Sequence, residues 1–243
     1  MSTITEPVQA FRYFVEDPDN PNRLGRHQVH DALLPELEAE VDHLEPIVDV
    51  EHAEIQEAFD QGDVGDCTMN AAYGTLVCEP FAEPGRTFTQ DTIVSGYELE
   101  TRLDDSQIPG HYPPTDTGST GAWSMTVLVH LGLIAAWRHT RSLATALRML
   151  LKGPISLGIP WYKSMFTPDG QNVIHVNLAS GLAGGHQVCV VGIDVRRKMI
   201  KIRNSWGTGW GDNGHCWLSW SDLGLLLKLG GDVVQPVMAK ASR

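Results

Sequence analysis

The chain has 243 residues, enough for one large domain or two lobes that share a cleft, and 42% of them are hydrophobic. Its net charge of −12 is concentrated in residues 1–60, which hold 15 acidic side chains against three arginines and no lysine. The remaining residues are electrically balanced. No basic face for nucleic acid is therefore expected, and no apolar run is long enough to cross a bilayer.

The first 56 residues are predicted to form an acidic extension. Residues 1–30 contain the turn-forming stretch 17–22 and are expected to be irregular. Residues 31–45 carry apolar side chains at spacings of three and four, which predicts a short amphipathic helix. These side chains are Leu34, Leu37, Val41 and Leu44. The helix could simply be solvated on its acidic face, or it could lie across a cleft in the body.

The body, residues 57–243, changes from helical to extended patterns along its length. Helices are predicted at 67–78, 122–133 and 142–151, with a polar, turn-rich region between the first two. Beyond Pro154 the extended patterns predict strands, at 155–159, 173–176, 188–194, 199–203 and 216–220. Helices followed by strands indicate an α+β fold with a helical lobe at about 57–152 and an antiparallel β lobe at about 153–243.

One cysteine stands where a nucleophile would be activated. Cys67 follows the glycine-punctuated loop Gln61–Asp66 and begins the first predicted helix. The positive end of a helix dipole favours a thiolate over a thiol. Cys67 is therefore a candidate nucleophile, provided that the chain supplies a base.

His186 is the best candidate for that base among the ten histidines. It follows Gly184 and Gly185, which would leave room for a bound substrate, and it begins a predicted strand. Asn204 ends the next predicted strand, so a hairpin can place its amide beside the imidazole and fix which nitrogen faces the thiol. Trp206 would shield that hydrogen bond from water.

Three segments together resemble the papain superfamily of cysteine peptidases, in its bacterial or phage-type branch. They are residues 60–71 around Cys67, residues 184–188 around His186, and the run Arg203-Asn204-Ser205-Trp206-Gly207 with the glycines after it. They occur in the family order of Cys, His and Asn, and the similarity covers about residues 57–220. The resemblance implies a papain-like two-lobe fold, a helical N-terminal lobe with the Cys helix, and peptide or protein substrates.

The resemblance also implies roles for individual residues. Gln61 would donate its side-chain amide to the oxyanion, together with the backbone N–H of Cys67. Cys67 would attack a peptide carbonyl to form an acyl-enzyme, with His186 as proton carrier. A paired imidazolium and the helix end would keep Cys67 ionised near neutral pH.

Several positions depart from the family pattern. Asp66 stands where the family has a small neutral residue. We expect it to cap the helix, although a carboxylate beside the thiol would raise the pKa of Cys67 and oppose catalysis. Val64 replaces a cysteine that secreted relatives use in a disulfide, and Thr68 replaces a common tryptophan. The papain-fold alternatives are a catalytically silent binding or structural protein, and a hydrolase of peptidoglycan or isopeptide bonds.

The cysteine count and the N-terminus predict a compartment. If Cys67 is a free thiol, three cysteines remain and cannot all pair in disulfides. The sequence contains no C-x-x-C pair of the kind typical of zinc sites, so we expect no metal and no cofactor. The chain opens without a recognisable secretory signal, which predicts a cytoplasmic location and leaves virion association open. Autoinhibition by the acidic N-terminal segment is a further hypothesis.

Overall fold

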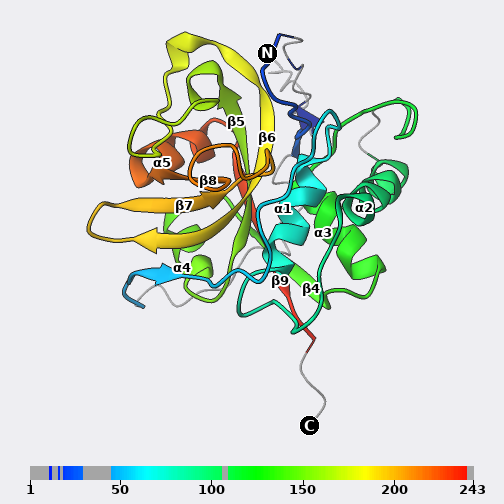
Figure 1. The fold of residues 1–243 in the computed structure, drawn as a ribbon, viewed down its shortest axis with the longest axis horizontal. Helices are drawn as coiled ribbons and strands as arrows, with labels where there is room; N and C mark the ends of the chain where they lie inside the picture. The colour runs from blue at the N-terminus through cyan, green and yellow to red at the C-terminus, as the bar shows by residue number, and fades with distance from the viewer. Residues whose placement is uncertain (1–10, 13–15, 17–18, 30–44, 106–108, 240–243) are drawn as a thin grey trace, which may run out of the picture.

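The computed structural model describes residues 11–12, 16, 19–29, 45–105 and 109–239. Helices α1, α2 and α3 gather on one side of the molecule, and an antiparallel sheet with two further helices makes up the other side (Figure 1). This is the α+β, two-lobe arrangement that the sequence predicts. The amphipathic helix expected at 31–45 falls almost wholly on residues 30–44, which lie outside the described part of the chain.

Within the described residues the sheet has seven strands, and six of them follow the order β4-β9-β5-β6-β7-β8, with β3 paired to the far end of β6. Every strand pair in it is antiparallel. The strands are β3 (Val50–Glu51), β4 (Ala136–Thr140), β5 (Ile155–Tyr162), β6 (Leu182–Asp194), β7 (Met199–Arg203), β8 (His215–Ser219) and β9 (Asp232–Val237). Because β3 joins this sheet, the body starts earlier than residue 57.

Five α-helices lie within the described residues, and four begin at a side-chain cap. Thr89, Thr120, Ser142 and Ser219 each accept a hydrogen bond from a backbone N–H in the first turn of their helix. The helices are α1 (Cys67–Leu76), α2 (Gln90–Leu103), α3 (Gly121–His130), α4 (Leu143–Leu150) and α5 (Trp220–Lys228), with short 3-10 turns at Lys163–Met165 and Leu178–Ser180. None of these helices is long and apolar enough to cross a membrane.

Strand β6 separates two hydrophobic cores. Val188 and Val190 point into the core of the β lobe, whereas Cys189 and Val191 point into the core that α1, α2 and α3 enclose. Successive side chains of a strand point to opposite faces, so one continuous apolar run serves both cores. The same strand carries His186 near its start, at the boundary between the lobes.

The N-terminal residues are more regular than expected. Strands β1 (Phe11–Arg12) and β2 (Gln28–Val29) pair antiparallel, although residues 1–30 were predicted to be irregular. The turn prediction is confirmed for residues 19–22, which bend and turn. In Figure 1 the blue N-terminal segment, which includes residues 19–29, lies between helix α1 and strand β6.

The predicted helices at 67–78, 122–133 and 142–151 and four of the five predicted strands are confirmed within a few residues. Helix α2 contradicts the turn-rich prediction for 79–121, and residues 173–176 form only an isolated bridge to Trp217 instead of a strand. Strands β4 and β9 and helix α5 were not predicted. Two of these elements, α2 and β9, carry residues that matter for the site.

Candidate active site

The loop Gln61–Asp66 delivers Cys67 to the first position of α1, as the sequence predicts. All ten residues of α1 are buried, and the Cys67 side chain is fully covered. The backbone of Gln187, the residue after His186, forms a hydrogen bond with the thiol. The structure therefore brings the cysteine to the strand that carries the histidine.

His186 and Asn204 meet across the β6–β7 hairpin. His186 Nε2 lies 2.8 Å from Asn204 Oδ1, and the Ser205 backbone N–H donates to the same oxygen at 2.9 Å. An oxygen that accepts both bonds requires a proton on Nε2, which leaves Nδ1 as the basic nitrogen of a neutral ring. The indole of Trp206 stacks on the imidazole, with ring centroids 4.7 Å apart and planes at 19°, so it covers this hydrogen bond.

Gln61 lies in the same loop and is almost fully buried. Its Oε1 accepts a hydrogen bond from Ser205 Oγ at 2.6 Å, and its Nε2 donates to the carbonyl of Val64 at 2.8 Å. The Gln61 backbone N–H also donates to the Ser205 carbonyl. These bonds join the cysteine loop to the asparagine segment, and the second amide hydrogen of Gln61 is left for another acceptor.

Residues 23–27 of the N-terminal segment lie in the cleft between the two lobes. The backbone N–H groups of Gly25 and Arg26 donate to the carbonyl of Gly185 at 3.3 and 2.9 Å. On the other side, the Gly25 carbonyl accepts from Ser119, whose own carbonyl accepts from His27. The segment thus connects the residue before His186 to the helical lobe through an isolated bridge between Arg26 and Ser119.

The close approach of this segment explains several glycines. A Cβ atom on Gly25 would lie 2.0 Å from the carbonyl oxygen of Gly65, two residues before the nucleophile, and the φ of Gly25 is +152°. A Cβ on Gly184 would lie 2.9 Å from the Leu24 side chain. At Gly184, the room that the sequence analysis assigns to a bound substrate holds the protein's own Leu24.

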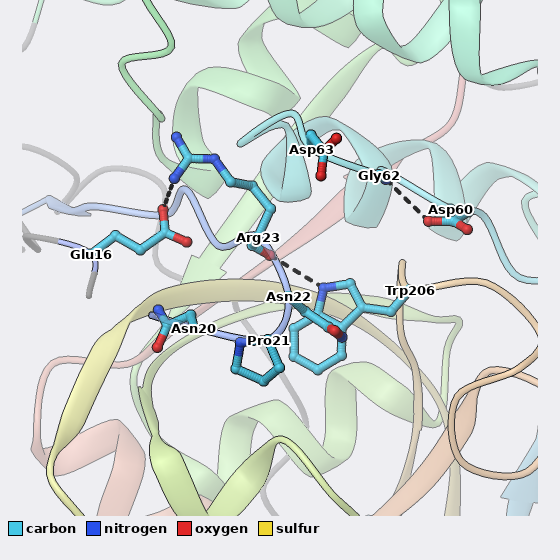
Figure 2. A pocket seen from close by; sticks show the side chains of 9 residues that line it. All are labelled: Glu16, Asn20, Pro21, Asn22, Arg23, Asp60, Gly62, Asp63 and Trp206. Carbon is cyan, nitrogen blue, oxygen red and sulfur yellow. Dashed lines mark hydrogen bonds and ion pairs between the residues drawn. The ribbon is translucent and has the colours of Figure 1, made fainter. Parts of the chain in front are cut away.

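Side chains of the segment add polar contacts at the cleft. Arg23 pairs with Glu16 and with Asp116, 3.0 Å away, and the Trp206 indole N–H donates to the Arg23 carbonyl at 3.2 Å. Figure 2 shows Arg23 turned toward Glu16, with Asp63 on the facing loop and Trp206 below. Between them is a polar cavity of about 390 Å³.

The covered cleft holds the two reacting groups in their neutral forms. Burial raises the pKa of the Cys67 thiol well above its usual value, and the charges of Asp66, Glu100 and Glu16 raise it further. Burial lowers the pKa of His186 to about 4. Both pKa shifts oppose the predicted thiolate–imidazolium pair while the cleft is covered, because desolvation of the two groups is the largest cause of each shift.

Asp66 does not cap the helix through its side chain, which corrects the prediction. Its carboxyl group is fully buried and accepts hydrogen bonds from Asn70 Nδ2 at 2.8 Å and from Gln90 Nε2 at 2.9 Å. Burial is the main cause that raises the pKa of Asp66 to about 8, with the charge of Asp116 adding to it. The carboxyl group is therefore largely protonated at neutral pH and places little negative charge beside the thiol.

This shift predicts a pH-dependent stability. The folded pKa of Asp66 lies above the unfolded value of about 3.9. The protonated side chain therefore contributes fully to the free energy of unfolding below pH 4, and this contribution is lost as pH rises toward 8. From the size of this pKa shift, we expect Asp66→Asn to be more stable than wild type by a few kcal/mol at pH 8. The difference should disappear at pH 4, where Asp66 is protonated in the folded protein.

Urea unfolding of both proteins at the two pH values measures the difference. Asp63→Asn is the matched control, because Asp63 lies in the same loop and is exposed. An equal difference between Asp66→Asn and wild type at pH 4 and pH 8 would contradict the protonation of Asp66.

The structure adds residues that sequence patterns did not single out. Ser205 connects Gln61 to the asparagine segment, and Ser119 pairs with the cleft-bound segment. Asp116, held by Tyr97 Oη at 2.6 Å and by the Gly65 N–H at 2.8 Å, faces Arg23. Among the described residues, no group of three or more His, Cys, Asp or Glu side chains is arranged to hold a metal ion.

The arrangement of a cysteine helix, a His–Asn pair on a β hairpin and a shared cleft defines a papain-like fold, and comparisons with known proteins agree. Residues 126–223, which include His186 and Asn204 but not Cys67, match the family described as papain family cysteine protease. A peptidase C1-like protein of Acanthamoeba polyphaga mimivirus, itself uncharacterised, is 38% identical over 72 residues. That match spans 28% of this chain and 23% of the viral protein.

Solved structures resemble the whole chain. Xylellain, a cysteine protease from Xylella fastidiosa, superposes with a TM-score of 0.64 at 15% identity, covering 98% of this chain and all of its own. The ragweed pollen cysteine protease Amb a 11 in its proform gives a TM-score of 0.57 at 15% identity, over 86% of this chain and 74% of its own. These likenesses show that the chain has the papain-like fold.

Proposed function

We propose that this protein is a cysteine peptidase that hydrolyses peptide bonds in protein or peptide substrates. The observation that carries the proposal is the His186–Asn204 hydrogen bond under Trp206, positioned beside the helix that begins with Cys67. Nucleophilic catalysis by cysteine needs a basic imidazole nitrogen that can reach the thiol, and His186 Nδ1, which has no hydrogen-bond partner among the described residues, can take this role.

In the proposed reaction, His186 Nδ1 takes the thiol proton and the Cys67 sulfur attacks the substrate carbonyl. The oxyanion receives hydrogen bonds from the Cys67 backbone N–H and from the second amide hydrogen of Gln61, and the two bonds that Gln61 already makes hold it in place. The imidazolium gives its proton to the leaving amine. Water, deprotonated by His186, then hydrolyses the thioester and restores the thiol.

We further propose that residues 23–27 keep the peptidase closed. The backbone N–H groups of Gly25 and Arg26 already donate hydrogen bonds to the carbonyl of Gly185, and Leu24 is completely buried. An extended substrate would need the same backbone groups, because a cleft of this kind binds peptides by adding a strand. Catalysis would therefore begin only when the segment leaves, which also returns water to Cys67 and His186.

An epoxide or iodoacetamide reagent tests the proposed activity directly. Hydrolysis of an unstructured protein should fall in parallel with the modification of Cys67 in molecules from which residues 23–27 have left, while Cys78, Cys189 and Cys216 stay unmodified because they lie inside the hydrophobic cores and not beneath the segment. Peptide mapping by mass spectrometry identifies the modified site. Hydrolysis that persists after complete modification of Cys67 would rule out the proposed nucleophile, and a thiol that stays inert after the segment has left would favour a silent papain-fold protein.

A further inference from the structure

Two cysteines that the proposed reaction does not use meet where the end of α1 packs on β6. Cys78 lies two positions beyond the last residue of α1, and Cys189 lies on β6, three positions after His186. Both are free thiols, and both are completely buried in the core that α1, α2 and α3 enclose. The pair therefore joins the helix that carries the nucleophile to the strand that carries the histidine.

Gly74 allows the helix and the strand to approach closely at this point. A Cβ atom on Gly74 would lie 3.1 Å from Cys189 Cβ and 3.6 Å from Cys189 Sγ. The Cys78 thiol donates to the Gly74 carbonyl at 3.1 Å, so both sulfur atoms lie against the same residue. The Cys78 thiol also forms a side-chain hydrogen bond with Cys189. A disulfide requires two neighbouring cysteines whose side chains face each other, and these contacts provide that arrangement.

Arg203 brings a positive charge to the pair. It stands opposite Cys189 in the register of β6 and β7, and its Nε would lie 3.8 Å from a Cβ atom on Gly74. Burial is the main cause that raises the pKa of Cys189, and the charge of Arg203 acts in the opposite direction. A neighbouring cation favours the thiolate, which is the form that reacts with oxidants. Cys189 is therefore the thiol expected to react first.

Glu54 connects this cluster to a cavity. Its backbone forms an isolated bridge with Cys78, and its carboxylate pairs with Arg203 and lies 2.8 Å from His215 Nε2. Glu54 and His215 also line a cavity of about 490 Å³. Hydrogen peroxide is little larger than water, so a local opening at Glu54 is enough to admit it to the thiols, whereas iodoacetamide and epoxide reagents are bulkier.

We propose that Cys78 and Cys189 are a peroxide-reactive pair that closes to a disulfide between α1 and β6. The Cys189 thiolate attacks one oxygen of hydrogen peroxide, the O–O bond breaks, and the departing hydroxide takes up the thiol proton, which leaves a sulfenic acid and water. The Cys78 sulfur then attacks the Cys189 sulfur, the S–O bond breaks, and the hydroxyl group leaves with the Cys78 proton as a second water. Two thiols are oxidised to one disulfide, and one peroxide is reduced to two waters.

The disulfide would act as a covalent staple. It would close a loop of more than one hundred residues, which restricts the unfolded chain and so stabilises the folded one. Cys216 cannot compete for either partner, because it lies in the other hydrophobic core. The staple does not depend on the proposed peptidase activity.

Peptide mapping tests the pairing. The full-length chain is treated with millimolar hydrogen peroxide, alkylated in denaturant and digested without reductant. We expect the peptide that contains Cys78 to be joined to the peptide that contains Cys189, with Cys216 alkylated. Cys78→Ala should stop at a sulfenic acid on Cys189 that dimedone traps, and Cys216→Ala should form the disulfide as wild type does. A different pairing, or a sulfinic acid on Cys189 beside an unreacted Cys78 in wild type, would overturn the proposal.

Thermal unfolding of wild type tests the staple and needs no substitution. The peroxide-treated chain should melt about 10 °C above the untreated chain, as expected for a disulfide that closes a loop of this length, and dithiothreitol should reverse the gain. Cys78→Ala/Cys189→Ala, which removes the pair, should show no gain after the same treatment. An equal gain in that double variant, or a disulfide that leaves the melting temperature of wild type unchanged, would contradict the staple.

Discussion

Replacing Cys67 with alanine should reduce the hydrolysis of an unstructured protein by about 10⁶-fold, because no other group can form the acyl-enzyme once the nucleophile is removed. The substitution removes one buried sulfur atom next to the cleft and leaves the His186–Asn204 hydrogen bond in place. Initial rates on a denatured protein or a fluorogenic peptide measure the effect.

Cys216→Ala is the matched control. Cys216 is equally buried but lies on β8 in the core of the β lobe, so its loss should cost some stability and leave kcat/KM within a small factor of wild type. Equal cleavage by Cys67→Ala and wild type would remove Cys67 from the mechanism, whatever the control shows.

Replacing Gly25 with alanine should open the cleft and accelerate the alkylation of Cys67 by about 100-fold. The new Cβ would lie 2.0 Å from the Gly65 carbonyl oxygen, and the positive φ of Gly25 adds a conformational cost. Strain of about 3 kcal/mol in the closed state corresponds to a factor of roughly 100 in the population of the open state. The second-order rate constant of iodoacetamide labelling at Cys67 is the measurement.

The pH dependence of that labelling shows in which direction the pKa of the Cys67 thiol changes when the cleft opens. In wild type the Cys67 pKa lies well above its usual value because the thiol is buried, so labelling should increase only at strongly alkaline pH. Exposure in Gly25→Ala should move the midpoint to lower pH. Gly85→Ala is the control, since Gly85 also has a positive φ but nothing lies within 4 Å of an added Cβ; an equal acceleration there would contradict the proposed closure.

The sequence predicts the α+β fold and the position of Cys67, His186 and Asn204, because each stands in a local pattern that repeats in known proteins. Helix α2 was missed for a physical reason. Its buried face contains Gly96, Glu100 and Thr101 beside Ile93 and Tyr97, so only two of these five residues are large and apolar, and the apolar periodicity is weak. Glu100, for example, accepts a hydrogen bond from Thr68 at 2.8 Å.

The error at Asp66 follows from that omission. The side chain stands at the start of a helix, where a cap is the reasonable prediction, but its partner Gln90 belongs to α2. Asp232 and Arg26 are still further apart in the chain, and neither lies in a recognisable motif. Their side chains pair at 2.6 Å because the Arg26 backbone is bonded to Gly185 on β6 and Asp232 stands on β9, with β5 between these two strands.

The placement of β6 has a consequence for how the molecule moves and unfolds. One strand supplies alternate side chains to both hydrophobic cores. Separating the two lobes would therefore expose either Cys189 and Val191 or Val188 and Val190 to water. The lobes should therefore melt in a single cooperative transition, detected as one calorimetric peak. Substrate entry would then depend on the proposed departure of residues 23–27 and not on a separation of the lobes.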